Sequence, residues 1–212
     1  MKYGRVLRLE FYSKALQFVV KNKLLIILSV FFISGFCAAI FCFSDSDIVT
    51  EFIKEYLSDF INERNGGKIF KTIIGSFLSY LCVFALSFIC GTSMFGMILI
   101  PALITLCAYF YGSLTAYVYS AYSFEGVAFF AVIILLPSVL FITAFLLASI
   151  EGINFSFKLS KLTFLENSAS DLMPEFKNYC MKYLLFSVLV FISSVADCLL
   201  SHNFLKNFSG II

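Results

Sequence analysis

The chain has 212 residues, of which 61% are hydrophobic and 13% charged, and its mean hydropathy is +0.97. A soluble domain contains roughly 25% charged and 45 to 50% apolar residues, so this composition excludes a soluble globular protein and indicates a polytopic membrane protein. The net charge of +2 and the absence of a Lys/Arg tract argue against nucleic acid as a partner.

The first unit, residues 1–23, is basic. It carries six Lys or Arg residues against one Glu. Apolar residues recur there at helical spacing, at Leu9, Tyr12, Leu16 and Val19. The pattern predicts an interfacial amphipathic helix on an anionic inner leaflet. An ordinary positively charged flank of the first span is the alternative.

Five apolar stretches follow, each close to the roughly 20 residues that a helix needs to cross a bilayer. The predicted spans are about 24–43, 72–91, 97–120, 127–150 and 183–200. They form one membrane domain over residues 24–212, with a turn around Ser123 to Gly126 and a polar loop over 158–182. The predicted fold class is all-α, a polytopic membrane helix bundle with an added acidic extracytoplasmic helix.

Small residues recur every fourth position in several spans, and two spans contain a proline. In lipid, close backbone approach over small side chains supplies much of the energy of helix association. A proline bends a helix where neighbours can satisfy the freed carbonyl. The expected helix-packing residues are Gly75, Ser79, Ser87, Gly91, Gly96, Pro101, Ala108, Gly112, Ala116, Gly126, Pro137, Ala144, Ala148 and Gly152. Chance recurrence is the alternative interpretation.

The connection between the first two spans contains an acidic helical segment. Its carboxylates stand at i, i+4 spacing, at Glu51, Glu55, Asp59 and Glu63. Aromatic and aliphatic residues form a separate stripe, at Ile48, Phe52, Tyr56 and Phe60. The acids are interpreted either as the solvated face of an amphipathic helix or as a docking surface for a basic partner.

Lys and Arg residues are distributed unevenly between the two sides of the membrane. With the N-terminus inside, the inner segments hold ten and the outer segments five. The positive-inside rule then predicts a multi-pass plasma-membrane protein with a cytoplasmic N-terminus and an extracytoplasmic C-terminus. The acidic segment would lie outside. Glu151 and Asp197, near span ends, are expected to reach the interface, with a role in ion passage as the alternative.

Motifs that carry enzyme chemistry are absent from the sequence. It contains no Ser/His/Asp or Cys/His set, no HExxH motif and no phosphate-binding glycine loop. We therefore expect no enzyme activity, no catalytic residue, no cofactor and no metal site.

The central stretch resembles the stage II sporulation protein M family over roughly residues 85–160. The residues that carry the resemblance are Gly91, Ser93, Gly96, Pro101, Phe110, Gly112, Gly126, Pro137, Leu140, Ala144, Ala148 and Phe155-Ser156. The resemblance implies an integral membrane scaffold that anchors and localises peptidoglycan hydrolases, stage II sporulation proteins D and P, for engulfment during endospore formation. The sequence departs from the wider family after the second proline, where Ser138 and Val139 replace an expected His-Gly, so an intramembrane polar site is not carried over.

Two other functions remain open. A permease-like membrane subunit of an ABC-type transporter is suggested by the basic N-terminal helix, the two proline-bent helices and the inner loop, although transport normally requires a polar path near the midplane. The second is a membrane protein that stabilises a complex unrelated to sporulation. A neighbouring ATPase gene would favour the permease.

Overall fold

The computed structural model of the protein describes residues 22–43, 48–65, 69–165 and 172–208. Its elements are α2 (Lys23–Phe41), α3 (Ile48–Asn65), α4 (Ile69–Gly91), α5 (Gly96–Phe129), the π-helical segment η1 (Phe130–Leu135), α6 (Leu136–Leu165) and α7 (Leu172–Phe208). These ranges contain no strand, so the predicted all-α class is confirmed. The predicted interfacial helix over 1–23 lies almost entirely outside the described residues.

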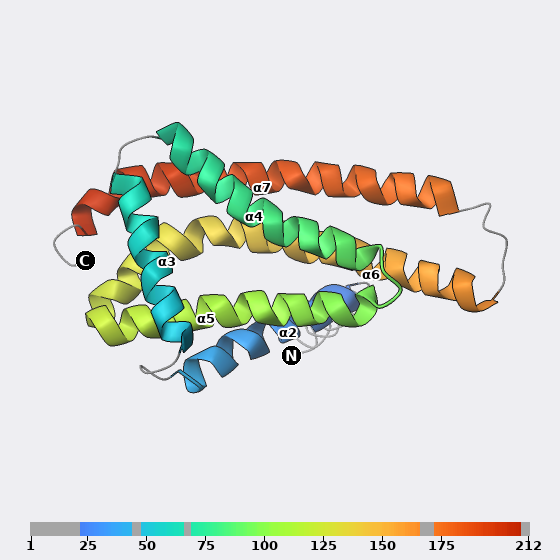
Figure 1. The fold of residues 1–212 in the computed structure, drawn as a ribbon, viewed down its shortest axis with the longest axis horizontal. Coiled ribbons are helices and arrows are strands. Elements are labelled where there is room, and N and C mark those ends of the chain that lie inside the picture. Colours follow the sequence, from blue (N-terminus) through green and yellow to red (C-terminus); the bar gives the residue numbers. More distant parts are fainter. Residues whose placement is uncertain (1–21, 44–47, 66–68, 166–171, 209–212) are drawn as a thin grey trace, which may run out of the picture.

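Four segments are long and apolar enough to cross a membrane, namely Lys23–Phe41, Ile69–Gly91, Gly96–Thr163 and Leu172–Asn203. The third has 68 residues and would be about 100 Å long as a straight helix, against a hydrocarbon core of about 30 Å. It reverses direction at Ser123, whose φ of 56° and ψ of −143° are not helical, and α6 returns beside α5 (Figure 1). With this segment counted as two helices, five helices are able to cross a membrane by their length and composition, and the predicted bundle is confirmed.

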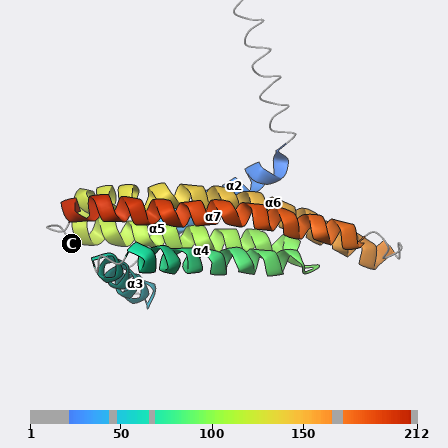
Figure 2. The same cartoon turned by 90° about the horizontal axis from the view of Figure 1, so that it is seen from above.

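The crossing helices alternate in direction along a common axis. In Figure 1, α2, α5 and α7 run one way, whereas α4 and α6 run the other. The bundle core is formed by α2, α4, α5, α6 and α7, and its buried residues include Leu28, Phe84, Ile100, Ile104, Ala144, Ala148 and Val190. α3 lies across one end of this bundle, and Figure 2 shows it outside the layers of crossing helices.

The predicted polar loop over 158–182 is wrong for most of its length. α6 continues to Leu165 and α7 begins at Leu172. Charged side chains there pair between the two helices, Lys158 with Glu175 and Lys182 with Glu151, each with 2.8 Å between Nζ and a carboxylate oxygen. The polar sequence continues both helices because its charges have partners on the neighbouring helix.

Hydroxyl groups satisfy backbone carbonyls near both intramembrane prolines. Thr105 Oγ1 donates to the carbonyl oxygen of Pro101 at 2.9 Å. Pro137 directly follows the first residue of α6, after η1, and its carbonyl accepts a 2.8 Å hydrogen bond from Ser193 Oγ of α7. A π-helical segment beside a proline is a common way to absorb a lost backbone hydrogen bond. The irregular part of α6 is thereby joined to α7.

Candidate functional site

The structure places one apolar face of α3 against the end of the bundle. Ile53, Leu57 and Phe60 are buried. They pack on residues of α5 and η1, which are Leu114, Val118, Phe129, Phe130, Ile133 and Ile134. The spacing i, i+4, i+7 keeps the three α3 residues on one side of a helix with 3.6 residues per turn. α3 is therefore a packed part of the domain.

The stripe read from the sequence is not the face that α3 buries. In that stripe Phe52 is 58% exposed, Tyr56 is half-buried and Phe60 is buried. Both Phe52 and Tyr56 have rings edge-on to Phe110 of α5, at centroid distances of 6.4 and 5.2 Å. Burial raises the pKa of the Tyr56 phenol above its ordinary value, so this group stays neutral and can pack against the bundle.

The last turn of α3 is anchored by Arg64. Its Nη2 lies 2.5 Å from Asp197 Oδ2 of α7 and donates to Ser76 Oγ of α4 at 3.1 Å. Its Nε donates to Ser201 Oγ of α7 at 3.0 Å. The guanidinium carbon also lies 3.2 Å from the centre of the Phe60 ring. A single side chain thus joins α3 to two crossing helices.

The expectation that Asp197 reaches the interface is wrong. Its side chain is 2% exposed, and that of Arg64 is 6% exposed. Ser76 Oγ donates a further hydrogen bond to Asp197 Oδ2 at 2.5 Å. A buried charge at membrane depth is costly unless it is paired, and here the partner stands 133 residues earlier in the chain. Glu151 is half-buried and pairs with Lys182.

The row of acids lies on the solvent-facing side of α3. Its four members are exposed, namely Glu51, Glu55, Asp59 and Glu63. Glu63 Oε1 lies 3.6 Å from Lys71 Nζ, whereas the other three have no ion pair in the part of the chain that the structure describes. Because α3 is fixed to the bundle, these carboxylates form a negative surface of defined shape. Its role in docking stays a prediction.

A small cleft opens between α3 and the bundle beside the anchor. It is lined by acids and hydroxyls of α3 and α4 together with Arg64 and Asp197, and encloses about 110 Å³. Small-molecule sites typically enclose roughly 300 to 1,000 Å³. The residues described contain no group of three or more His, Cys, Asp or Glu able to hold a metal ion. This cleft is smaller than a typical small-molecule site.

Three of the expected packing glycines lie where helix backbones approach closely. A Cβ added to Gly91 would lie 2.9 Å from the Cα of Gly152, which brings α4 against α6. A Cβ on Gly112 would lie 2.5 Å from the carbonyl oxygen of Phe36, which brings α5 against α2. Such distances leave no room for a side chain.

The other expected packing residues differ in burial. Those that are buried are Ser87, Gly96, Ala108, Gly126, Pro137, Ala144 and Ala148. Pro101 and Ala116 are half-buried. Gly75 and Ser79 line the cleft beneath α3, and a Cβ on Gly75 would meet only Glu63 Oε2, at 3.4 Å. The row expected along α4 therefore packs closely at the Ser87 and Gly91 end alone.

A comparison with protein families matches residues 27–196 to the family described as Stage II sporulation protein M. The matched region runs from α2 into the second half of α7 and includes α3. No curated protein and no solved structure matches the chain.

Proposed function

Because the chain belongs to the stage II sporulation protein M family, we propose that this multi-pass membrane protein is a scaffold that anchors and localises peptidoglycan hydrolases for engulfment. The partners implied by the family resemblance are stage II sporulation proteins D and P. In this role the partners carry out the chemistry, and the chain fixes their position in the plasma membrane.

The observation that carries the proposal is the fixed acidic face of α3. The buried contacts of Arg64 hold one end of the helix, while Ile53 and Leu57 pack its middle against the bundle. Glu51 and Glu55 remain available on the opposite side, and Asp59, which is also exposed, lines the cleft. Carboxylates on a rigid support steer a basic partner and set its orientation more than they raise its affinity.

The proposed orientation places this face where wall enzymes act. α3 and the C-terminal end of α7 lie at the same end of the bundle (Figure 1). The opposite end carries the lysines of the α6–α7 extension, among them Lys158, Lys161 and Lys177. The positive-inside rule assigns that lysine-rich end to the cytoplasm, so α3 and the C-terminus are extracytoplasmic in this proposal.

The test is a crosslinking pull-down of the tagged chain from sporulating cells, in mild detergent. The variant replaces Glu51, Glu55, Asp59 and Glu63 with Gln. The matched control is Glu125→Gln, which removes one exposed acid just beyond the Ser123 reversal. We expect wild type and control to recover the two hydrolases and the fourfold variant to recover much less, with the same unfolding midpoint for all three proteins.

Two results would count against the proposal. Equal recovery of hydrolases by the fourfold variant would refute docking on α3 while leaving the scaffold role in place. A cytosolic ATPase as the main stoichiometric partner, with or without the substitutions, would overturn the scaffold role. It would favour the alternative, a permease-like membrane subunit of an ABC-type transporter.

A further inference from the structure

α6 and α7 carry the same polar motif at the end of the bundle away from α3. In each helix a Glu is followed by an Asn three residues later and a Lys seven residues later, giving Glu151, Asn154 and Lys158 in α6 and Glu175, Asn178 and Lys182 in α7. The spacing i, i+3, i+7 puts the three side chains of each motif on one helix face. An aromatic residue, Phe155 or Tyr179, follows each Asn.

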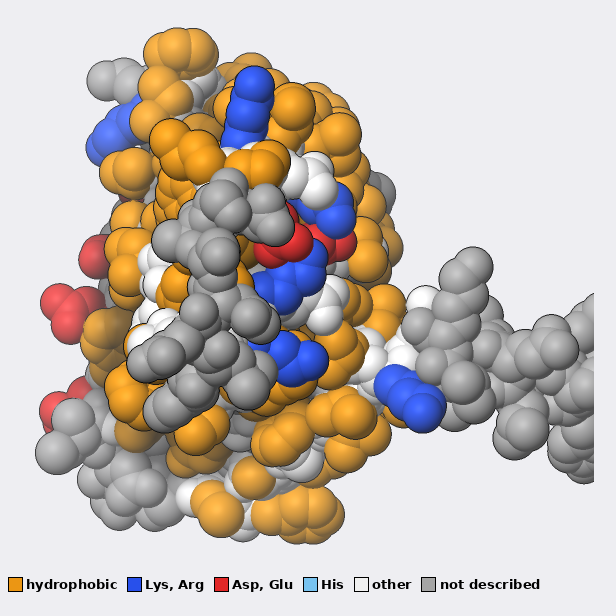
Figure 3. Space-filling view, turned by 90° about the vertical axis from the view of Figure 1, so that its right-hand side faces the viewer, with side chains coloured by type: hydrophobic (Ala, Val, Ile, Leu, Met, Phe, Trp, Pro, Cys, Tyr) orange, Lys and Arg blue, Asp and Glu red, His pale blue; other side chains and the backbone are white. Residues whose placement is uncertain are grey.

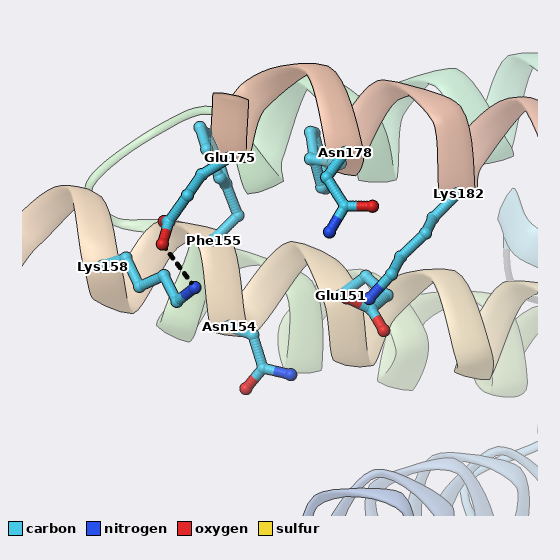
Figure 4. A pocket seen from close by; sticks show the side chains of 8 residues that line it. Glu151, Asn154, Phe155, Lys158, Glu175, Asn178 and Lys182 are labelled. Carbon is cyan, nitrogen blue, oxygen red and sulfur yellow. Dashed lines mark hydrogen bonds and ion pairs between the residues drawn. The ribbon is translucent and has the colours of Figure 1, made fainter. Parts of the chain in front are cut away.

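The two helices are antiparallel. The two motifs therefore face each other but run in opposite directions. Figure 4 shows the result: the Lys of each motif reaches the Glu of the other, and the two asparagines lie between the ion pairs. The two Nζ to carboxylate distances are both 2.8 Å. Beneath them the rings of Phe155 and Tyr179 stack with centroids 4.8 Å apart and planes 11° apart. The stacked rings form an apolar floor.

The cleft above this floor has unused hydrogen-bonding capacity. It encloses about 80 Å³, enough for several water molecules or for the charged groups of one ligand. An ammonium has three donors and a carboxylate about four lone-pair sites, and each ion pair uses only part of them. Neither Asn154 nor Asn178 has a hydrogen-bond partner among the described residues, and both are exposed.

The charges of the cleft balance, and this restricts the ligand. Two ammonium groups and two carboxylates line it, with one lysine and one glutamate paired at each end. A purely anionic ligand would therefore lie beside a carboxylate at either end. A zwitterion can place its anion beside the lysine and its cation beside the glutamate of one pair. Charge repulsion against the wrong ligand is a usual source of selectivity.

The surroundings of the cleft place it at the depth of lipid headgroups. Large apolar side chains are exposed beside it, at Phe157, Met181, Leu184 and Leu185. Figure 3 shows Lys and Glu side chains gathered on this end of the molecule within a mostly hydrophobic surface. Polar groups at the end of an apolar span lie at the membrane interface.

We propose that the α6–α7 cleft binds the headgroup of an aminophospholipid, whose phosphate carries one negative charge and whose primary ammonium carries one positive charge. The lysine of one ion pair donates to the phosphate, and the glutamate of the same pair accepts from the ammonium. Either pair, Lys158 with Glu175 or Lys182 with Glu151, can hold the headgroup in this way. The ammonium of phosphatidylethanolamine has N–H donors for these carboxylates, that of phosphatidylcholine has none, and phosphatidylglycerol has no cation. The proposal does not depend on the scaffold role.

Native mass spectrometry of the full chain tests this. The detergent-purified protein is incubated with an equimolar mixture of phosphatidylethanolamine, phosphatidylcholine and phosphatidylglycerol with identical acyl chains. We expect about tenfold more retained phosphatidylethanolamine than phosphatidylcholine, the factor for one lost charge-assisted hydrogen bond. Equal retention of phosphatidylglycerol and phosphatidylethanolamine by wild type would overturn the proposal.

Two double variants should shift phosphatidylglycerol retention in opposite directions. A folding defect would lower retention in both variants, so the opposite changes report lipid selectivity. Glu151→Gln with Glu175→Gln leaves a cationic cleft and raises phosphatidylglycerol retention relative to phosphatidylethanolamine. Lys158→Gln with Lys182→Gln lowers retention of both lipids by about fivefold, because each bound headgroup loses one lysine contact. An unchanged lipid ratio in the first variant would show that the ion pairs only join the helices, and would refute the proposal.

The control and a competition arm complete the test. Glu51→Gln with Lys54→Gln removes one acid and one base from exposed positions of α3 and should leave the lipid ratios unchanged. Soluble phosphoethanolamine, added at the concentration of the lipid, should displace little of it because it lacks the acyl chains. Complete displacement would identify a soluble phosphate ester as the ligand and overturn the assignment to a lipid.

Discussion

Arg64 and Asp197 form a buried ion pair between the last turn of α3 and the second half of α7, with 2.5 Å between Nη2 and Oδ2. The pair closes a loop of 133 residues that contains α4, α5 and α6. The position of the acidic face relative to the bundle therefore depends on this guanidinium and its acceptors as well as on the packed side chains of Ile53 and Leu57.

Loss of the Arg64 side chain should destabilise the protein strongly. Arg64→Met leaves the Asp197 carboxylate buried without its cation, and removal of one partner from a buried pair costs about 3 to 5 kcal/mol. Thermal unfolding in detergent measures the change, and limited proteolysis within α3 reports its release. Arg64→Met combined with Asp197→Leu should recover part of the loss, because no lone charge remains. A single variant as stable as wild type would show that the pair contributes little.

Two glycines of α4 should respond oppositely to alanine. Gly91→Ala puts a Cβ 2.9 Å from the Cα of Gly152, and overpacking of this kind costs about 1 to 3 kcal/mol. Gly75→Ala meets only a flexible carboxylate oxygen at 3.4 Å and gains helix propensity, up to about 1 kcal/mol. Unfolding midpoints in the same detergent give the comparison. Equal effects of the two substitutions would contradict the close contact between α4 and α6.

The reversal between α5 and α6 predicts a preference at Ser123. A φ of 56° is easily reached by glycine and strained for other residues, most of all for β-branched ones. Ser123→Gly should raise stability by up to about 1 kcal/mol, whereas Ser123→Val should lower it by about 1 kcal/mol or more. Because Ser123 is exposed, packing contributes little to either change. Thermal unfolding of both variants decides the matter, and a valine variant more stable than the glycine variant would contradict the turn geometry.

The proposed orientation predicts opposite labelling of the two ends of the bundle. In a background whose seven cysteines are replaced, Glu55→Cys should react with a membrane-impermeant maleimide in intact cells. Lys161→Cys should react only after permeabilisation. Both native residues are exposed, so a difference in labelling between the two positions would report the side of the membrane and not burial in the protein. The reverse pattern would place α3 in the cytoplasm and exclude contact with wall enzymes through its acidic face.

The five crossings could be predicted from sequence because long apolar runs and an intervening turn are local signals. The continuation of α6 and α7 through 158–182 could not, since the charges of this segment suggest a loop until Lys158 and Lys182 are seen to pair across the helices. Burial of Asp197 was missed for the same reason. Its partner is distant in sequence, and spacing along the chain carries no information about it.

For α3, the exposed acidic side chains could be predicted from the sequence, but the buried apolar side chains could not. Exposure of Glu51 and Glu55 follows from the amphipathic pattern of the helix alone. The buried side does not follow the stripe that contains Phe52, because positions four apart drift around a helix with 3.6 residues per turn, and Ile53 is buried in place of Phe52. Which of two adjacent apolar residues is buried depends on the shape of α5 and η1, and this is set by tertiary packing.

The contacts of Arg64 have a mechanical consequence. Ser201 and Asp197 belong to α7 and Ser76 to α4, so a pull on α3 is transmitted to two crossing helices and through them to the surrounding bilayer. A protein that grips the exposed side of α3 while bound to a rigid wall would drag the whole bundle with it. Tension along that path would load the guanidinium of Arg64 together with the packed side chains of Ile53 and Leu57, and loss of these contacts would free α3 to swing on the chain that joins it to α2 and α4.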